Sequence, residues 1–437
     1  MQIKNFLGKR IFFVMLLAAI LCEILYVAYL TINLQSKNIP AYMCFYGVLF
    51  LVYLFAVLFI KRRPTHLHEE RLTKNKLFLL VLIGGIVFRA TLIPSQITTS
   101  DDVYRYVWEG KVLCNGYNPY QHAPSDTALS LLHSKDLPAK VTFKNNAAIY
   151  PPVAQILFAA NYLISGEKEY GLKLFYLIFE IITMIFIALI LKERRKDPAL
   201  IVYYAWLPLP VMEFFVNVHV DPVGIAFFVM FLYFIIKDNI PAAALSFAFS
   251  FLAKLYPVFI LPLIIKKIGF KKTVIFGAII AAVIICSFLP FIPRNRFFAE
   301  FLFKYLANWQ FNGSFYNIFQ SLLHDGHQAK LICNVLLIVS IIGIAIFYKD
   351  FLRAVCFSFI AVIAFTATIY PWYLGWVAAI NPVLGLYSVT WLFFTVNLSN
   401  FTPLGPVWKE YSWVLLVEYI PFYLLLGYDF FYKKINE

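Results

Sequence analysis

The sequence predicts an all-α, polytopic transmembrane protein. Of its 437 residues, 62% are hydrophobic and only 14% are charged, whereas aqueous domains carry roughly a quarter charged residues. Apolar runs of about 20 residues, the length of a membrane-spanning helix, recur along the chain. Basic residues gather in the short loops between these runs, as cytoplasmic loops do. We therefore expect roughly 12–14 spans, with juxtamembrane helices in the first long outer loop.

The net charge of +14 is a topology signal in this setting. No nucleic-acid-binding motif accompanies the basic loops, so we expect no nucleic-acid partner. The six cysteines lie mostly inside apolar runs and lack metal-ligand spacing, which is typical of small buried hydrophobic residues. We expect no cofactor and no metal site, although a divalent ion is not excluded by these residues.

Charge placement also sets the direction of the first spans. Basic residues precede a first span at about 11–31, which lacks a signal-peptide cleavage site and is expected to be retained. A second span, near 41–60, leads to a strongly basic loop at 61–76 that we place in the cytoplasm. A third span, 77–94, then carries the chain outward, so the following polar segment is expected on the outer face.

The middle of the chain contains one apolar stretch that is too short to be a span. The segment ending near 164 would, as a span, place a basic loop outside, so we expect an amphipathic surface helix with proline in its first turn. The fourth span is then 171–191, and the fifth 199–212. The stretch 241–265 is predicted to be a helical hairpin with Lys254 to Pro257 at its tip, and a single span is the alternative.

The last third continues the same alternation and completes one integral-membrane domain, 1–437. A span at 273–289 is followed by an outer segment, two spans around Lys349 and Asp350, and an outer Tyr370 to Tyr373 motif; two further crossings to Phe394 would return both termini to the cytoplasm. The domain comprises two extra N-terminal spans (1–76), a catalytic core (77–380) with outer loops 95–148 and 293–330, and C-terminal spans (381–437).

Polar and aromatic side chains converge on the predicted outer face. Polar groups close to a bilayer are costly and usually line a cavity, so their convergence predicts a site. The predicted catalytic residues are Asp102 and Asp101; the predicted substrate- or donor-binding residues are Arg105, Tyr106, Glu109, Asn118, Tyr150, Gln155, Asn217, His219, Asp221, Lys254, Trp309, Asn312, Tyr370, Trp372 and Tyr373.

The two adjacent carboxylates are given different roles. Neighbouring residues of a helix point about 100° apart, so both cannot face one substrate equally. Asp102 is predicted to be a general base that takes a proton from an attacking hydroxyl. Asp101 or Ser100 is predicted to cap the helix that begins here.

Several of the other candidates have structural alternatives. Arg105 lies one helical turn from Asp102, and either a simple ion pair or a contact with phosphate or sugar would explain it. Lys254 is an isolated cation that needs an anionic partner, for which a lipid phosphate would serve, and Arg294 and Arg296 are alternative phosphate ligands. His219 with Asp221 fits a helix start as well as acid–base or metal chemistry. The aromatic residues fit an interfacial belt or sugar stacking.

An ordered set of motifs resembles the GT-C superfamily of membrane glycosyltransferases that use polyprenyl-phosphate sugars. The closest resemblance is to bacterial polyprenyl-phosphomannose-dependent mannosyltransferases. The set covers about 77–379 and consists of Ser100-Asp101-Asp102-Val103-Tyr104-Arg105-Tyr106, Trp108-Glu109-Gly110, Gly116-Tyr117-Asn118-Pro119-Tyr120, Ala123-Pro124, Tyr150-Pro151-Pro152, Asn217-Val218-His219-Val220-Asp221, Lys254-Leu255-Tyr256-Pro257 and Tyr370-Pro371-Trp372-Tyr373.

The resemblance implies a GT-C-like fold and an inverting sugar transfer at the outer membrane face, with the acid before Val103-Tyr104 as the base. The implied substrates are a polyprenyl-phosphate-linked sugar and a glycan or glycolipid acceptor. Independently, nucleotide sugars are not expected outside the cytoplasm and the chain has no glycine-rich phosphate loop, which favours a donor carried on a lipid. The implied location is the plasma (inner) membrane of a bacterial cell envelope. The alternative function is a lipid or sugar transporter or flippase, which would place ionisable residues near mid-membrane.

Overall fold

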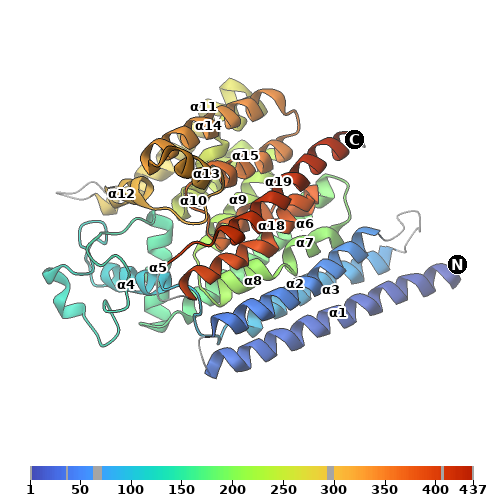
Figure 1. The fold of residues 1–437 in the computed structure, drawn as a ribbon, viewed down its shortest axis with the longest axis horizontal. Helices are drawn as coiled ribbons and strands as arrows, with labels where there is room; N and C mark the ends of the chain where they lie inside the picture. Colours follow the sequence, from blue (N-terminus) through green and yellow to red (C-terminus); the bar gives the residue numbers. More distant parts are fainter. Residues whose placement is uncertain (1, 36–37, 63–70, 293–299, 405–407, 436–437) are drawn as a thin grey trace. The chain divides into compact units, whose positions relative to one another are not determined.

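The computed structural model describes residues 2–35, 38–62, 71–292, 300–404 and 408–435. The regular elements of this part of the chain are all helices (Figure 1), and two isolated bridges join Phe311 and Asn312 to Thr368. Six helices are long and apolar enough to cross a membrane, or seven if one bent pair forms a single span. The all-α, multi-pass architecture predicted from composition is confirmed.

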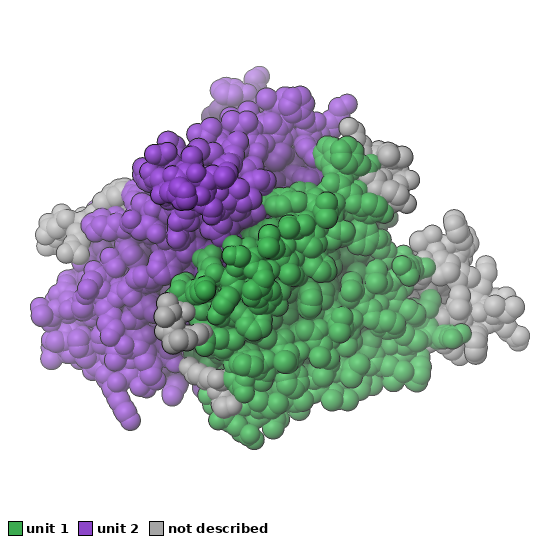
Figure 2. All heavy atoms as spheres, in the orientation of Figure 1, with its two compact units in different colours: residues 1–99, 177–217, 374–437 green, residues 100–176, 218–373 purple. Residues whose placement is uncertain are grey.

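The chain divides into two compact units (Figure 2), each made of several chain segments. Unit 1 comprises residues 1–99, 177–217 and 374–437, and unit 2 comprises 100–176 and 218–373. The predicted core, 77–380, contributes to both units. The helix α6 (Tyr170–Glu193) begins in unit 2 and continues in unit 1.

Unit 1 begins with three long helices, α1 (Gln2–Gln35), α2 (Ile39–Arg62) and α3 (Arg71–Thr91). α1 and α2 match the first two predicted spans and are among the helices able to cross a membrane, whereas α3 covers the third predicted span but is not among them. α1 packs against α2 and α3. The predicted fifth span is broken into a 3-10 turn (Pro198–Ile201), α7 (Val202–Ala205) and α8 (Pro208–Phe215), which bend by 50° at a break next to Pro208. Proline lacks the N–H that a continuous helix requires, so a break there is expected.

The C-terminal part of unit 1 differs from the predicted double crossing. Residues 375–404 form α16 (Gly375–Ala378), α17 (Asn381–Leu384), α18 (Tyr387–Thr395) and a 3-10 segment (Val396–Leu404), followed by the long α19 (Ser412–Ile435). Each span needs about 20 helical residues. The 22 residues from Leu374 to Thr395 therefore suffice for at most one crossing, and the structure divides them into short helices.

Unit 2 starts with the predicted juxtamembrane helices, α4 (Asp102–Cys114) and α5 (Pro152–Ser165), joined by a loop with a 3-10 turn (Thr127–Leu132). As predicted, α5 begins with proline at its first position, where the missing N–H costs nothing. The two helices pack closely because Gly110 has no side chain: a Cβ there would lie 2.1 Å from the Phe158 carbonyl oxygen.

Two short apolar helices, α9 (Asp221–Ile236) and α10 (Ile240–Ala253), continue unit 2 and pack side by side. The chain then breaks at Lys254, as the predicted hairpin tip requires, and resumes in a 3-10 turn (Tyr256–Ile260) and α11 (Leu261–Phe288). A residue with φ 76°, Gly269, interrupts α11. That break separates the second arm of the hairpin from the predicted span at 273–289.

The rest of unit 2 contains α12 (Glu300–Asn308), α13 (Ser314–Leu323), α14 (Gly326–Phe347) and α15 (Phe351–Phe365), followed by a 3-10 turn (Pro371–Leu374). Helices of 14 to 16 residues, such as α9, α10 and α15, are only about 21–24 Å long, less than the hydrocarbon core of a bilayer. The long apolar helices are therefore fewer than the 12–14 spans expected from apolar runs alone.

Candidate active site

Asp102 begins α4 at the start of unit 2. Its backbone N–H donates to the Ser100 hydroxyl (3.3 Å), so Ser100 is the residue that caps this end. Asp101 occupies the N-cap position but its side chain makes no capping hydrogen bond, and it is exposed. The Asp102 side chain is 38% exposed. The adjacent carboxylates therefore lie in different environments, as the different roles predicted for them require.

Residues of three separate sequence motifs meet around Asp102 within unit 2. The Nδ1 atom of His219 lies 3.8 Å from the Asp102 carboxylate. Asp221, two residues later, opens α9, and its two oxygens accept from the Lys254 ammonium at 2.7 and 2.8 Å. A short connection makes α9 and α10 antiparallel, which brings the start of α9 next to the end of α10. Residues 33 positions apart are thereby paired.

The electrostatics of the cluster suit a carboxylate base. Although its side chain is 38% exposed, Asp102 is surrounded closely enough by protein that desolvation raises its pKa to about 6, against the lowering effect of Lys254 and Arg105 and with a further rise from Asp101 and Asp221. Burial and the nearby Lys254 charge hold the pKa of His219 well below its ordinary value, so the imidazole is neutral at pH 7. Asp102 is thus mostly ionised near neutral pH and more basic than an ordinary carboxylate.

A row of stacked rings leads to His219. The His219 ring lies on Trp372 at 3.5 Å between centroids, Trp372 on Tyr370 at 4.3 Å, and Tyr370 on Phe311 at 4.5 Å, all within 19° of parallel. Trp309 fixes the row from the side, because its indole N–H donates to the Tyr370 hydroxyl (2.8 Å). Interleaved rings of this kind hold the imidazole in one orientation.

The neighbouring Tyr373 packs edge-to-face on Tyr370 and Trp372 of the row and also contacts the cation of the site. Lys254 lies 4.6 Å from the centre of the Tyr373 ring, close enough for a cation–π interaction. The hydroxyl of Tyr373 is hydrogen-bonded to that of Tyr305. The predicted Tyr370 to Tyr373 motif therefore supplies contacts to both His219 and Lys254.

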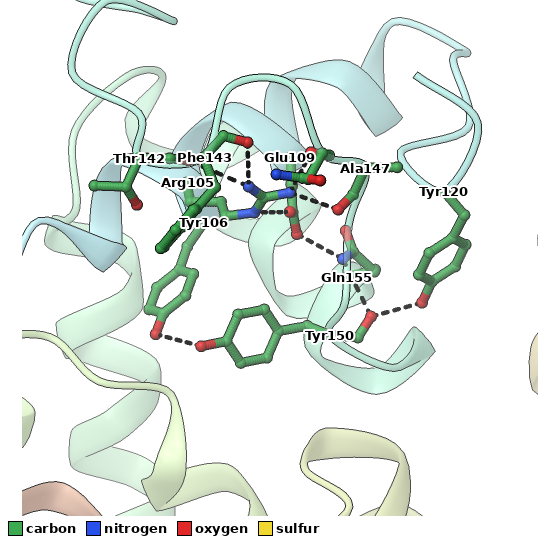
Figure 3. Close-up of polar contacts among 10 residues, drawn as sticks. Arg105, Tyr106, Glu109, Tyr120, Thr142, Phe143, Ala147, Tyr150 and Gln155 are labelled. Carbon is green, nitrogen blue, oxygen red and sulfur yellow. Dashed lines mark hydrogen bonds and ion pairs between the residues drawn. The ribbon is translucent and has the colours of Figure 1, made fainter. Parts of the chain in front are cut away.

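Arg105 organises the loop next to the site (Figure 3). Its guanidinium bonds Glu109 (2.8 Å) and four backbone carbonyls of the loop. Gln155 donates to the other Glu109 oxygen (2.7 Å). All three side chains are at most 5% exposed. The ion pair of Arg105 is with Glu109, one turn after it, and not with Asp102, one turn before it; the contact with a sugar or phosphate stays a prediction.

Tyr106 and Tyr150 lie on the same side of this network. Their hydroxyls are 3.0 Å apart, and the Tyr106 ring stacks on Phe158 of α5 at 4.7 Å. The Tyr120 hydroxyl donates to the Tyr150 carbonyl (2.7 Å), as Figure 3 shows. Tyr106 is one turn after Asp102 on α4, so both side chains share a helix face.

The predicted asparagines are more dispersed. Asn118 shapes a loop: its amide accepts from Tyr120 N–H (3.0 Å) and donates to the Phe291 carbonyl (2.9 Å). Asn312 has φ 54° at the bridge to Thr368. Asn217 belongs to unit 1, where it accepts from the Thr99 N–H (3.0 Å) and donates to Glu213 and Tyr42. A contact of any of these three asparagines with a donor or an acceptor stays a prediction.

Two further observations complete the description of the predicted site. The described residues contain no group of three or more His, Cys, Asp or Glu side chains placed to hold a metal ion. Arg294 and Arg296 lie outside the described residues. Sequence reasoning missed Tyr305 and Phe143, which contact Tyr373 and Trp309; among 46 phenylalanines and 28 tyrosines, no sequence signal distinguishes them.

Comparison with known proteins gives one match. Residues 20–268 match the family model described as "Alpha-(1->6)-mannopyranosyltransferase, N-terminal domain", of the MptA/B family. Searches of curated proteins and of solved structures gave no significant match. The matched range contains Asp102, Arg105, His219, Asp221 and Lys254. An enzyme of sugar transfer is therefore favoured over the transporter alternative.

Proposed function

Because the chain belongs to the alpha-(1->6)-mannopyranosyltransferase family, GT-C-type enzymes of the MptA/B group, we propose that it moves mannose from a polyprenyl-phosphate donor to a hydroxyl of a glycan or lipid-linked acceptor at the outer membrane face. The chain is a mannosyltransferase and a multi-pass membrane protein. The lipid-linked donor and the outer-face site are our proposals.

Asp102 acts as the general base of a single displacement. The acceptor hydroxyl attacks the anomeric carbon of mannose while its proton passes to the Asp102 carboxylate. The bond between that carbon and the phosphate oxygen breaks, and its electron pair leaves with the lipid phosphate. Attack opposite the leaving group inverts the anomeric configuration. The alpha-(1->6) linkage of the family name then requires a mannose that is β-linked to phosphate in the donor.

Lys254 offsets the charge that develops on the leaving phosphate. Its ammonium is held by Asp221 and the Tyr373 ring in the same cluster as Asp102. A fixed cation beside a developing anion stabilises the transition state without reorganisation during the reaction. His219 is neutral and stacked on Trp372. It therefore lies next to the Asp102 carboxylate without cancelling its negative charge.

Topology supports a lipid-linked donor. Nucleotide sugars are not expected outside the cytoplasm, and the distribution of basic loops in the sequence predicts the Asp102 segment on the outer side of the membrane. A donor whose lipid anchor lies in the bilayer would reach an outer-face site directly. The observation that carries the proposal is the convergence of Asp102, His219, Asp221 and Lys254 in unit 2.

The test is a transfer assay with purified protein in nanodiscs, polyprenyl-phosphate mannose and a mannoside acceptor. Wild type should release polyprenyl phosphate and form an alpha-(1->6) product. Asp102→Asn should lower the rate by about 10²–10⁴-fold, whereas Asp101→Asn, the adjacent matched change, should cost less than about tenfold. Equal rates for wild type and Asp102→Asn would refute Asp102 as the base, and no transfer by wild type to any mannoside would refute the proposed reaction.

A further inference from the structure

The loop between the 3-10 turn Thr127–Leu132 and α5 owes its conformation to one buried side chain, that of Arg105. Arg105, on α4, donates to the carbonyls of Thr142 (3.3 Å), Phe143 (3.4 Å), Asn146 (2.8 Å) and Ala147 (2.7 Å). A guanidinium has five donors in a rigid plane, so this set of acceptors fixes the loop in one conformation. Figure 3 shows the carbonyls gathered around it.

Phe143 has an unusual backbone within this loop. Its φ is 54°, in the left-handed region that favours glycine. A bulky side chain there is disfavoured and persists only where the surroundings impose it, often at a binding site. Here the Phe143 carbonyl accepts from both Arg105 and the Asn146 N–H (3.0 Å). The loop therefore holds a strained conformation that glycine would adopt freely.

The strain presents an aromatic ring at the surface. The Phe143 side chain is 42% exposed although it belongs to a polar loop. It packs edge-to-face with Trp309 (5.3 Å) and against Phe301 (5.7 Å). Through Trp309, whose indole N–H donates to the Tyr370 hydroxyl, Phe143 is linked from the side to the ring row that reaches His219 and Asp102.

Exposed charged groups lie on the same loop as Phe143 and at the start of α4. Lys140, three residues before Phe143, lies 3.1 Å from Asp136 and 5.4 Å from the Tyr104 ring centre, and it interacts electrostatically with Asp101. Lys140 is about half exposed and Asp101 is exposed. An exposed aromatic ring on a loop that also carries exposed charged groups suits a glycan, because the ring takes the apolar C–H face of one sugar and charged groups bond hydroxyls.

We propose that Phe143 contacts a sugar ring of the acceptor glycan, and that Arg105 is the positioning residue that holds it there. This proposal rests on the proposed function. Several rings separate Phe143 from Asp102, so the sugar that it contacts lies beyond the one that carries the attacking hydroxyl. An acceptor with two mannose units uses this contact, and an acceptor with one does not.

The experiment measures kinetics in nanodiscs with polyprenyl-phosphate mannose and two synthetic acceptors, octyl α-mannoside and octyl α-1,6-mannobioside. Phe143→Ala and Phe143→Gly should each raise the KM of the mannobioside about fivefold, leave the mannoside KM within about twofold and leave the donor KM unchanged. Phe143→Trp should restore the mannobioside KM. The glycine variant relieves the backbone strain, so a defect shared by both variants comes from the lost ring.

Arg105→Gln provides the positioning test. It should raise the mannobioside KM by the same factor as Phe143→Ala, and the two changes combined should cost no more than either alone. A folded state of each variant is checked by its elution profile and melting temperature. If Arg105→Gln is misfolded, the test uses Asn146→Pro instead. This change removes the N–H that is bonded to the Phe143 carbonyl.

Equilibrium binding separates this proposal from the proposed function. Titration of mannobioside, followed by the fluorescence of Trp309 and its neighbours in Asp102→Asn, should give a Kd that Phe143→Ala raises about fivefold. Binding without any transfer by wild type would refute the reaction but keep the subsite. Transfer with unchanged KM and Kd in Phe143→Ala would refute the subsite alone. A defect of Phe143→Ala that is seen in lipid nanodiscs but not in detergent would also refute the subsite, because it would indicate that Phe143 anchors the protein to the membrane.

Discussion

The ammonium of Lys254 is bound by both oxygens of Asp221, at 2.7 and 2.8 Å, in a pair that is almost withdrawn from water. The two residues belong to different sequence motifs, and each had its own explanation at the level of sequence. Their pairing means that the cation of the site is held in place by a carboxylate of the chain itself. Asp221 is only 1% exposed, so its buried carboxylate depends in turn on the charge of Lys254.

Breaking this pair should destabilise the fold more than removing both charges. Asp221→Asn leaves Lys254 buried next to an amide, and the loss of one member of a buried pair costs about 3–5 kcal/mol. Lys254→Met combined with Asp221→Asn leaves no unpaired charge and should recover at least half of that loss. Thermal unfolding in detergent measures both, and an additive loss in the double variant would show that the two charges are independent. Transfer activity should stay low in the double variant, because the cation is still missing.

The pH dependence should report the raised pKa of Asp102. A base with a pKa of about 6 must be deprotonated to act, so kcat/KM should be constant at neutral pH and fall below about pH 6, to roughly a tenth at pH 5. Lys254 lowers this pKa, so Lys254→Gln should move the inflection to higher pH. Asp101 raises it, so Asp101→Asn should move the inflection to lower pH. Shifts in the opposite directions would contradict the assignment of Asp102 as the titrating base.

His219 should contribute through its position beside the base. His219→Phe keeps a ring that can stack on Trp372 but removes the nitrogen 3.8 Å from Asp102. We expect a melting temperature close to that of wild type and a kcat lowered about tenfold, the order of one lost hydrogen bond in the transition state. His219→Ala should lose the stack as well and melt at a lower temperature. A kcat equal to that of wild type in His219→Phe would limit His219 to packing.

Sequence reasoning predicted the long helices well because a membrane leaves few alternatives for a 20-residue apolar run. The expected span at 171–191 is α6, and the expected surface helix with proline in its first turn is α5. The sequence-based prediction overestimated the number of membrane crossings at 374–395. The apolar content is high there, but the chain turns at Pro382 and Gly385. Hydropathy measures burial, and these short helices are largely buried within unit 1 without being spans.

The site was predictable only to the extent that it depends on topology. Once the helical hairpin was predicted, the start of α9 and the end of α10 had to lie at the same end of that helix pair. This brings His219 and Asp221 close to Lys254. The partners of Arg105 could not be predicted in the same way, because every residue offers a backbone carbonyl and only the folded loop selects four of them. The same reason hides Phe143, whose significance comes from its φ and its exposure.

Gly110 provides a test of how α4 is held. An added Cβ would meet the Phe158 carbonyl oxygen of α5 at 2.1 Å, and backbone cannot yield as a flexible side chain does. Gly110→Ala should therefore separate α4 from α5, lower stability by about 1–3 kcal/mol and displace Asp102 at the start of α4, with a loss of transfer activity. The matched control is Gly277→Ala in α11, where nothing lies within 4 Å of the new Cβ. Since alanine is favoured over glycine within helices by roughly 0.5–1 kcal/mol, Gly277→Ala should melt at or above the wild-type temperature. Equal melting temperatures for both variants would show that the α4–α5 contact yields without cost.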